Sequence, residues 1–470
     1  MKKIAFVLLG GIFTLTTFAA DENPVADYVV ISPKNYVKLW TWYIGERAKA
    51  HPNVTFAVKS AEDIYATYQY GEGKDYRNAA ESIKAYITAE TKTGTKYFVL
   101  GGMWFDVQAT AATVQGVTLT VDNAIPGITA YPVEEKSSAG YFDQYPSDLY
   151  FACPANWDPN NDGEYCGKGE LTTKGELTPA CIVSRMDFRP TEYVKKSDGS
   201  IPTYEELVRA YVNKLEGGEN RVFEGNNRFA GLSGQAKMEG TTYDEDGNPD
   251  TYYTMNLRLN TAIKEARPSS TTYLATLKED YTEDDTIPMK ERILGENWEM
   301  FMPYDHGTIE GISFLSTECF GNNAGLIKFL ACNTPCFGGT VNNFLYSGVA
   351  ETAISNPNGG ALVAIGNTSY GQSTDTSFTL RYCGISDEML DWTLDAYLEG
   401  KTAGEAWKYA ISKYVGIIYG ENQVEEVEKR SCSIEDHLHY IQSAIIEEIL
   451  FGDPLIKLQP QHIAPRIIVK

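Results

Sequence analysis

The chain has 470 residues, with 40 Lys and Arg against 63 Asp and Glu, which gives a formal net charge of −23. Its composition is 43% hydrophobic, which is typical of a globular chain with enough apolar material for a large core. The acidic balance excludes nucleic acid as an expected partner, because binding to phosphate needs surfaces rich in Lys and Arg. The length predicts roughly two to four domains, or one large two-part unit.

The N-terminus has the layout of a secretory signal peptide over residues 1–20. Two lysines precede an apolar run over 4–18, and Ala19 and Ala20 supply the small residues at a cleavage site. The run is shorter than the ~20 residues of a membrane span, so we expect no membrane insertion after the signal is cleaved. The sequence therefore predicts an exported protein that is secreted, periplasmic or held at the cell surface.

The first 190 residues alternate between strand and helix patterns. The predicted elements are strands over 27–32, 54–58, 96–102 and 182–183, and helices over 36–49 and 80–91. Such alternation is typical of βαβ units, which form a parallel sheet covered by helices.

The second part of the chain repeats this alternation after a polar stretch. The predicted elements are helices over 204–215, 344–355, 388–398, 403–414 and 434–451, and strands over 298–304, 326–331 and 360–366. The polar residues 216–290 are predicted to be an insertion or long connection, with a hairpin tip at 243–250.

Few histidines are available for chemistry, since the chain has only five. His306 stands apart because it ends an apolar strand and is followed at once by Gly307, which lets the backbone of a ligand approach closely. His51 lies in a loop between a helix and a strand and is predicted to be a surface residue. His437 and His439 lie two positions apart on a predicted helix, so they face different sides and are poor joint metal ligands.

Cys332 lies at the carboxyl end of the strand predicted over 326–331, the edge at which open parallel sheets bind ligands. Neighbouring strands would present His306 and Cys332 side by side, and a cysteine needs such a base to become a thiolate near neutral pH. The alternative is that Cys332 is a buried core cysteine or forms a disulfide with Cys336.

The eight cysteines are too few for a disulfide scaffold in a chain of this length, although export permits disulfides and leaves their pairing open. Their spacing contains no Cys-x-x-Cys pair, which excludes a zinc ribbon.

Two blocks make the sequence recognisable. Pro303-Tyr-Asp-His-Gly307 and Phe329-Leu-Ala-Cys332 resemble the His-Gly and Ala/Gly-Cys blocks of the clan CD cysteine peptidases. The wider match is to the gingipain family, peptidase C25. It rests on further similar blocks at 27–32, 61–65, 96–102, 147–151, 157–163, 182–185 and 450–455. The resemblance spans about residues 27–457.

This resemblance implies a caspase-like α/β fold: a three-layer α/β/α sandwich with mostly parallel sheets and two side-by-side subdomains. The subdomains would comprise residues 21–190 and the catalytic residues 191–457, followed by a tail over 458–470. The family implies that Cys332 is the nucleophile and His306 the general acid and base. The backbone N–H groups of Gly307 and Cys332 would form the oxyanion hole, and catalysis would need no cofactor.

The chain departs from the family at the residue that orients the histidine. Gingipains carry an acid five positions before the arginine that corresponds to Arg185, and this chain has Ala180 there. Glu176, Asp187 or a backbone carbonyl would have to replace that acid. The segment between Arg185 and His306 is also longer than we expect for the family.

Specificity is implied only at the level of the family. Asn367, Thr368 and Ser369, which follow a buried strand, would line the primary pocket, and gingipains cleave after Arg or Lys by means of a pocket acid. The sequence does not identify that acid here, so a basic P1 residue is a family-level expectation.

Residues 158–164 offer oxygen ligands at alternating positions. Asp158, Asn160, Asp162 and Glu164, with Gly163 at the sixth position, match the first half of a calcium loop, which predicts a structural calcium ion. The alternative is a plain turn rich in Asp and Asn.

The sequence therefore predicts an exported cysteine endopeptidase that hydrolyses proteins or peptides through a Cys332 thioester. The alternative is a catalytically inactive C25-like protein that binds peptides or surface partners. An esterase ranks third, because the segment 231–235 does not match Gly-x-Ser-x-Gly. The oligomeric state is left open.

Overall fold

The computed structural model describes residues 25–458, apart from gaps at 72, 75, 108–111, 115–116, 132–144, 167–173, 197, 222, 224–226, 234–249, 278–281, 306, 309, 334, 336–347, 370–384 and 421–441. The predicted signal peptide, the C-terminal tail after Leu458 and most of the predicted hairpin tip lie outside the described residues. So do His306, His437 and His439.

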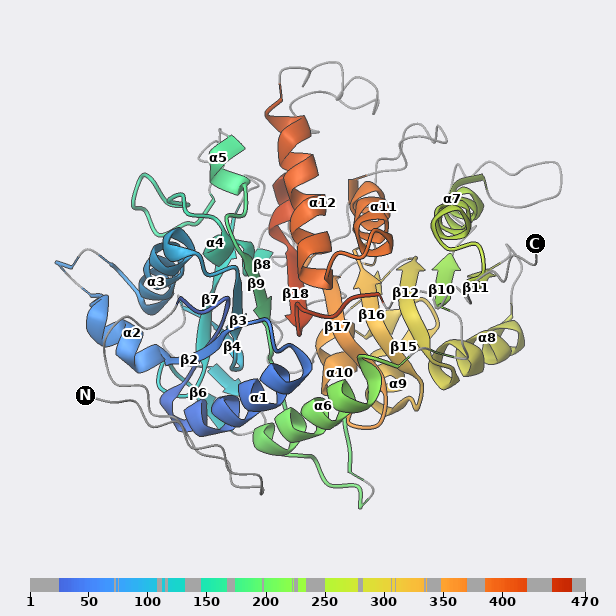
Figure 1. Cartoon of the computed structure of the whole chain (residues 1–470), viewed down its shortest axis with the longest axis horizontal. Coiled ribbons are helices and arrows are strands. Elements are labelled where there is room, and N and C mark those ends of the chain that lie inside the picture. Colours follow the sequence, from blue (N-terminus) through green and yellow to red (C-terminus); the bar gives the residue numbers. More distant parts are fainter. Residues whose placement is uncertain are drawn as a thin grey trace, which may run out of the picture.

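One ten-stranded sheet runs through the molecule in the order β11-β10-β12-β16-β17-β18-β9-β3-β1-β2 (Figure 1). Its strands are β1 Tyr28–Ser32, β2 Phe56–Ser60, β3 Tyr97–Leu100, β9 Ile182–Arg185, β10 Arg228–Ser233, β11 Thr271–Thr276, β12 Trp298–Tyr304, β16 Leu326–Cys332, β17 Gly360–Asn367 and β18 Glu448–Gly452. All neighbouring pairs are parallel except β17 with β18, so the predicted α/β class with a mostly parallel sheet is confirmed.

The antiparallel pair at the centre reverses the direction of the sheet. β12, β16 and β17 run one way, whereas β18, β9, β3, β1 and β2 run the other. The carboxyl ends of the first group therefore share an edge of the sheet with the amino ends of the second group. Residues that follow β16 and residues that precede β9 lie at this common edge.

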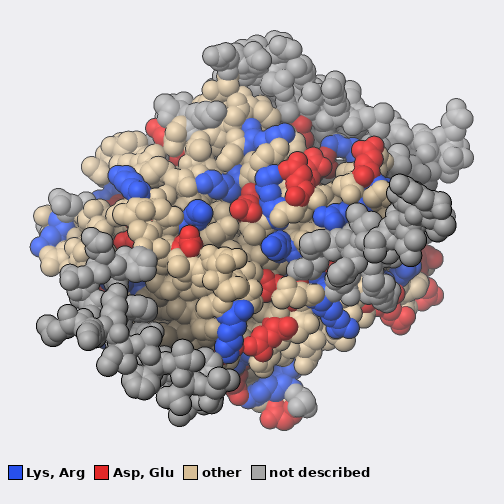
Figure 2. All heavy atoms as spheres, in the orientation of Figure 1, with Lys and Arg blue, Asp and Glu red and all other residues tan. Residues whose placement is uncertain are grey.

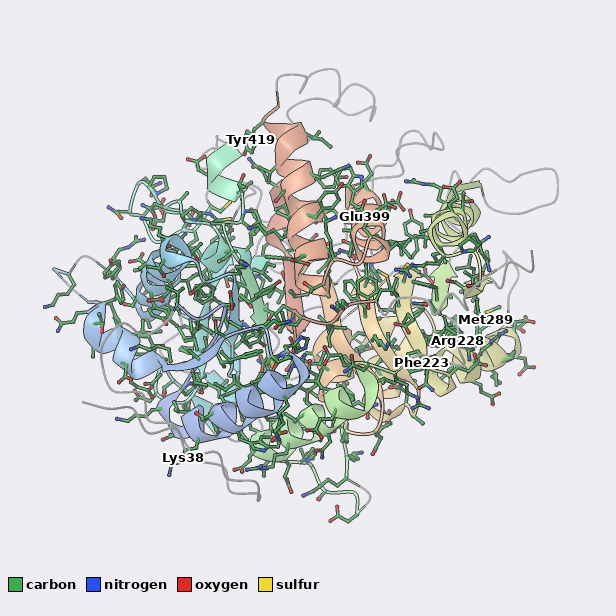
Figure 3. All side chains as sticks on the ribbon, in the orientation of Figure 1. Lys38, Phe223, Arg228, Met289, Glu399 and Tyr419 are labelled. Carbon is green, nitrogen blue, oxygen red and sulfur yellow. The ribbon has the colours of Figure 1, made fainter. Side chains whose placement is uncertain are left out.

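Helices complete the three-layer sandwich. They are α1 Val37–Ala50, α2 Ala61–Thr67, α3 Ala79–Thr93, α4 Leu149–Ala152, α5 Lys174–Leu177, α6 Tyr204–Gly218, α7 Asp250–Ala266, α8 Glu283–Gly295, α9 Thr317–Asn322, α10 Val349–Ser355, α11 Ile385–Leu398 and α12 Ala403–Ile418. In Figure 1, α1, α6 and α10 lie in the lower part and α7, α11 and α12 in the upper part. Side chains fill the space between these layers and the sheet (Figure 3). Within the ranges given above, no helix is both long and apolar enough to cross a bilayer.

Short strands form smaller sheets beside the main one. They are β4 Trp104–Asp106, β5 Ala112–Val114, β6 Val117–Leu119, β7 Ile125–Ala130, β8 Tyr145–Ser147, β13 Gly307–Thr308, β14 Gly311–Ile312 and β15 Leu315–Ser316. The β4-β7-β8 sheet lies in the first half of the chain, and the β13-β14-β15 sheet follows β12.

The prediction that residues 216–290 form an insertion or connection is wrong, because they supply β10, α7, β11 and α8. β10 and β11 are parallel neighbours with α7 between them in the chain, so no hairpin joins them. β11 is the edge strand of the sheet and is half exposed over most of its length. A strand in that position tolerates the threonines that made this stretch look like a loop.

The helix predicted over 434–451 is also wrong at its end. Residues 448–452 form β18, a fully buried strand between β17 and β9. The consecutive acids Glu447 and Glu448 interrupt the apolar run there, and in a helix they would have faced solvent. Here both are buried in the middle of the sheet.

Candidate active site

Cys332 is the last residue of β16, and its partner in the β17 register is Gly366. Its side chain is fully buried. The parallel neighbour β12 ends at Tyr304, so the chain that leads to His306 starts from the same edge of the sheet. His306 itself lies outside the described residues, and its contact with Cys332 therefore stays a prediction. Gly307 begins β13 and is partly exposed.

Among the residues that the structure describes, no cation lowers the pKa of the Cys332 thiol. Burial, and next the charge of Glu448, raise its pKa well above that of an ordinary cysteine. Cys332 is a free thiol, as are Cys153, Cys181 and Cys319.

A buried hydrogen-bond relay ties the ends of three strands together beside Cys332. The amide nitrogen of Asn333 donates to both carboxylate oxygens of Glu448, at 2.8 Å each. The amide nitrogen of Asn367, at the end of β17, donates to the carbonyl oxygen of Asn333. All three side chains are buried. Burial raises the pKa of Glu448 to about 8, although the hydrogen bond from Asn333 opposes this rise.

The three residues predicted to line the primary pocket are buried next to the start of β18. Asn367 pairs in register with Glu448. The backbone N–H of Thr368 donates to the carbonyl oxygen of Glu447 at 3.0 Å, and its hydroxyl donates to that of Pro146 at 2.8 Å. Ser369 is also fully buried.

Glu447 is a second buried acid at this place. Burial raises the pKa of its carboxyl well above the usual range, and the charge of Glu448 adds to this effect. Sequence reasoning missed both acids. Two consecutive glutamates inside the apolar run 444–451 were the available signal, but the run was interpreted as a helix.

The structure also places Ala180, where the family has an orienting acid, and Asp187, which the sequence offered as its substitute. Ala180 precedes β9 and is exposed, and its carbonyl oxygen accepts a hydrogen bond from Lys408 at 2.7 Å. Asp187 follows the carboxyl end of β9, so it lies at the edge opposite to Cys332. There it accepts from the Trp104 backbone at 2.8 Å and pairs with Arg189 at 3.0 Å. Asp187 and Cys332 therefore lie at opposite ends of the strands of the sheet.

The predicted calcium loop has the geometry of a turn whose side chains bind its own backbone. One Asp158 oxygen accepts from the Gly163 N–H at 2.9 Å and from Arg77 at 2.5 Å, and the other accepts from the Asp162 N–H at 3.1 Å. Asn160 and Asp162 contact each other at 2.9 Å. Among the residues described, no group of three or more His, Cys, Asp or Glu side chains is arranged to hold a metal ion. These contacts are those of a turn rich in Asp and Asn, which was the alternative interpretation of the sequence. A bound calcium ion stays a prediction.

His51 was expected on the surface, and this expectation is wrong. Its Nε2 lies 2.8 Å from Glu219 and 2.6 Å from Arg47, in a largely buried charged cluster. The helix that carries Arg47 brings the histidine back against the end of α6, which the sequence does not reveal.

A groove of about 780 Å³ lies away from Cys332, along α3. Lys84 lines it and is almost completely buried, with its ammonium group 3.9 Å from the ring centre of Tyr150. Burial lowers the pKa of Lys84 to about 7.

Comparisons with known proteins add the family. Residues 21–459 match the model of peptidase family C25. Among solved structures, the chain is similar to one described as "Structure of Protease", at 14% identity and a TM-score of 0.52, over 93% of this chain and 79% of that one. This similarity supports the fold alone.

Two further similarities are weaker. Dimeric latent PorU from Porphyromonas gingivalis is 12% identical with a TM-score of 0.27, over 42% of this chain and 16% of that one. The Saccharomyces cerevisiae separase–securin complex is 13% identical with a TM-score of 0.34, over 59% and 14%. No curated protein matches the sequence.

Proposed function

We propose that this chain, which belongs to peptidase family C25, is an endopeptidase with Cys332 as the nucleophile and His306 as the general acid and base. Membership of the family supports cysteine-peptidase chemistry on proteins or peptides. The position of Cys332 carries the choice of nucleophile. It lies at the carboxyl end of a central strand in a mostly parallel sheet, the edge at which such sheets bind their ligands.

The reaction is acyl transfer. As the Cys332 sulfur attacks the peptide carbonyl carbon, its proton passes to His306. The backbone N–H groups of Gly307 and Cys332 donate to the oxygen that becomes negative. His306 then gives the proton to the leaving amine, and a thioester remains. Water deprotonated by His306 hydrolyses the thioester and restores the thiol.

The buried thiol favours a coupled proton transfer. Because burial raises the pKa of Cys332, a thiolate is scarce before substrate binds. The base must therefore remove the proton during attack, which makes His306 indispensable in this chain.

A basic P1 preference is supported by Glu447, a buried acid whose carbonyl oxygen accepts from the backbone N–H of Thr368. A guanidinium or ammonium group that entered there would favour its ionised form. We also propose that the protein is exported after loss of residues 1–20, and that calcium stabilises the loop 158–164. On the face seen in Figure 2, acidic and basic side chains are interspersed, which suits a solvated surface.

A catalytically inactive member of the family that binds peptides is the second candidate. Two observations favour it: Ala180 stands where the family has an acid, and Cys332 is fully buried.

The test uses peptide acyloxymethyl ketones with Arg, Lys, Asn or Asp at P1, added to the reduced mature protein with and without calcium. Mass spectrometry then maps the labelled residue. We expect labelling of Cys332 by the Arg or Lys probes, and none in Cys332→Ala or His306→Ala. Cys319→Ala is the matched control, because Cys319 is a more accessible free thiol. A folded protein with a free Cys332 thiol that no probe labels would support the inactive candidate.

A further inference from the structure

The chain leaves the sheet immediately after the nucleophile. The printed register of β16 with β17 ends at the pair of Cys332 and Gly366, so Asn333 is the first residue beyond this ladder. Side chains hold this residue instead. The side chain of Asn367 donates to its backbone carbonyl oxygen, and its own side-chain Nδ2 donates to both carboxylate oxygens of Glu448.

We propose that Glu448 is the positioning residue of the Cys332 site. Through the side-chain amide of Asn333 it holds the residue that follows the nucleophile, and its charge acts on the reactivity of the thiol. The catalytic consequence rests on the proposed function, whereas the effect on the thiol can be measured without it.

The positioning role follows from where Glu448 lies. It is the first residue of β18, the central antiparallel strand, and its register partner is Asn367. Its anchor is thus a buried strand rather than a loop, and its exposed fraction is 1%. An oxyanion donor on the backbone of Cys332 must be held to within a few tenths of an ångström to stabilise a transition state. Two hydrogen bonds to the side chain of the next residue, together with the bond from Asn367 to its carbonyl oxygen, provide such a restraint.

The charge role follows from the coupling between the carboxyl group of Glu448 and the thiol of Cys332. The carboxylate of Glu448 contributes to the raised pKa of Cys332, so ionisation of either group disfavours ionisation of the other. Glu447, the residue before β18, has the same sign of charge and is also buried here. On β9, the other neighbour of β18, Arg185 is opposite Phe451 and is paired with Asp148 at 2.6 Å.

The pH at which the coupling acts can be stated. Burial raises the pKa of Glu448 to about 8, so below pH 8 its carboxyl is mainly protonated and repels a thiolate little. Above pH 8 it is charged, and the thiol becomes harder to ionise. Alkylation of Cys332 should therefore rise less steeply with pH above 8 than that of an isolated thiol.

The experiment follows alkylation of the individual cysteines by iodoacetamide between pH 6 and 10, with mass spectrometric mapping. Glu448→Gln removes the charge but keeps an amide oxygen that can accept from Asn333. We expect its Cys332 to react about tenfold faster at pH 9, with Cys319 unchanged as the internal reference. Glu399→Gln is the matched control, because Glu399 is an exposed acid just after α11 (Figure 3).

A second measurement separates the positioning role of Glu448 from the effect of its charge. With the P1 substrate identified by the probes, Glu448→Ala should lower kcat at least tenfold with little change in KM, and Glu448→Gln should recover most of it. Unchanged Cys332 alkylation in Glu448→Gln would overturn the charge role. A normal kcat in a folded Glu448→Ala variant would overturn the positioning role. Alkylation could shift as expected while the wild type cleaves no peptide and reacts with none of the P1 probes. The proposed function would then fail, and the effect of Glu448 on the thiol would stand.

Discussion

Arg47 and Asp453, near opposite ends of the chain, form a buried ion pair with 2.5 Å between Nε and a carboxylate oxygen. Arg47 lies on α1, and Asp453 follows β18 directly. The same guanidinium pairs with Glu219 at 2.6 Å, and Tyr43 donates to Asp453 at 2.9 Å. The Gly-Asp-Pro turn that resembles the family's closing block thus connects the last strand to the first helix.

Asp453→Ala should lower the free energy of unfolding by about 3–5 kcal/mol, because it leaves the buried Arg47 without one of its two partners. Urea denaturation would measure the loss. The control is Glu205→Ala, which removes an exposed pair with Arg209 and should cost at most about 0.5 kcal/mol. Equal losses in the two variants would contradict a structural role for the buried pair.

Acid should weaken the same cluster through Glu219. Burial opposes ionisation of this carboxyl, but hydrogen bonds from His51 and Arg47 prevail and lower its pKa to about 2. A carboxyl with a lowered pKa stabilises the fold above its unfolded pKa of ~4.3, and this contribution is lost as the pH falls towards 2.

The wild type should therefore lose up to about 3 kcal/mol more than Glu219→Gln between pH 4.5 and 2. Chemical denaturation at a series of pH values measures the difference. Parallel stability curves for the two proteins would show that Glu219 does not contribute.

Lys84 predicts a rise of stability with pH in a higher pH window than Glu219 does. Its folded pKa of about 7 lies below the unfolded value, so between pH 7 and 10 the unfolded chain binds the additional proton. Stability from this group therefore rises with pH across that window. Lys84→Met should remove this rise of stability with pH, and it should be stabilised relative to the wild type at pH 6 to 7. Melting temperatures of the two proteins at pH 6, 8 and 9.5 test this, and identical slopes would refute it.

Lys328 and Glu299 form a fully buried pair between β16 and β12, at 3.1 Å. Burial lowers the pKa of Lys328 and raises that of Glu299, so desolvation outweighs their mutual attraction. We expect Lys328→Met alone to cost about 3 kcal/mol, and the double variant with Glu299→Leu to restore stability to within about 1 kcal/mol. A double-mutant cycle by urea denaturation measures the coupling, and additive losses would contradict it.

Much of the central sheet was predictable because buried parallel strands appear as continuous apolar runs, as in 28–32 and 360–366. β11 was missed because its polar residues are tolerated at the edge of the sheet, and β10, a short buried strand, was missed because it lies within a largely polar stretch of the sequence. β18 was missed because two acids lie at its start, and their burial depends on partners far away in the chain.

The candidate site likewise contains a residue that the sequence could predict and one that it could not. Cys332 could be predicted because it follows an apolar strand within a block that resembles a known family. Glu448 could not, because its hydrogen bond to Asn333 exists only once β17 lies between β16 and β18. A single sequence carries no local pattern for such a contact.

The position of β18 also has a consequence for biosynthesis. It is the only strand that joins the four strands built from residues 28–185 to the five built from 228–367, and it is the last described strand in the chain. A ribosome must therefore release the chain as far as residue 452 before the two groups of strands can join into one sheet. Until then Asn333 lacks Glu448, so a nascent or C-terminally truncated chain carries Cys332 without the acid that restrains it.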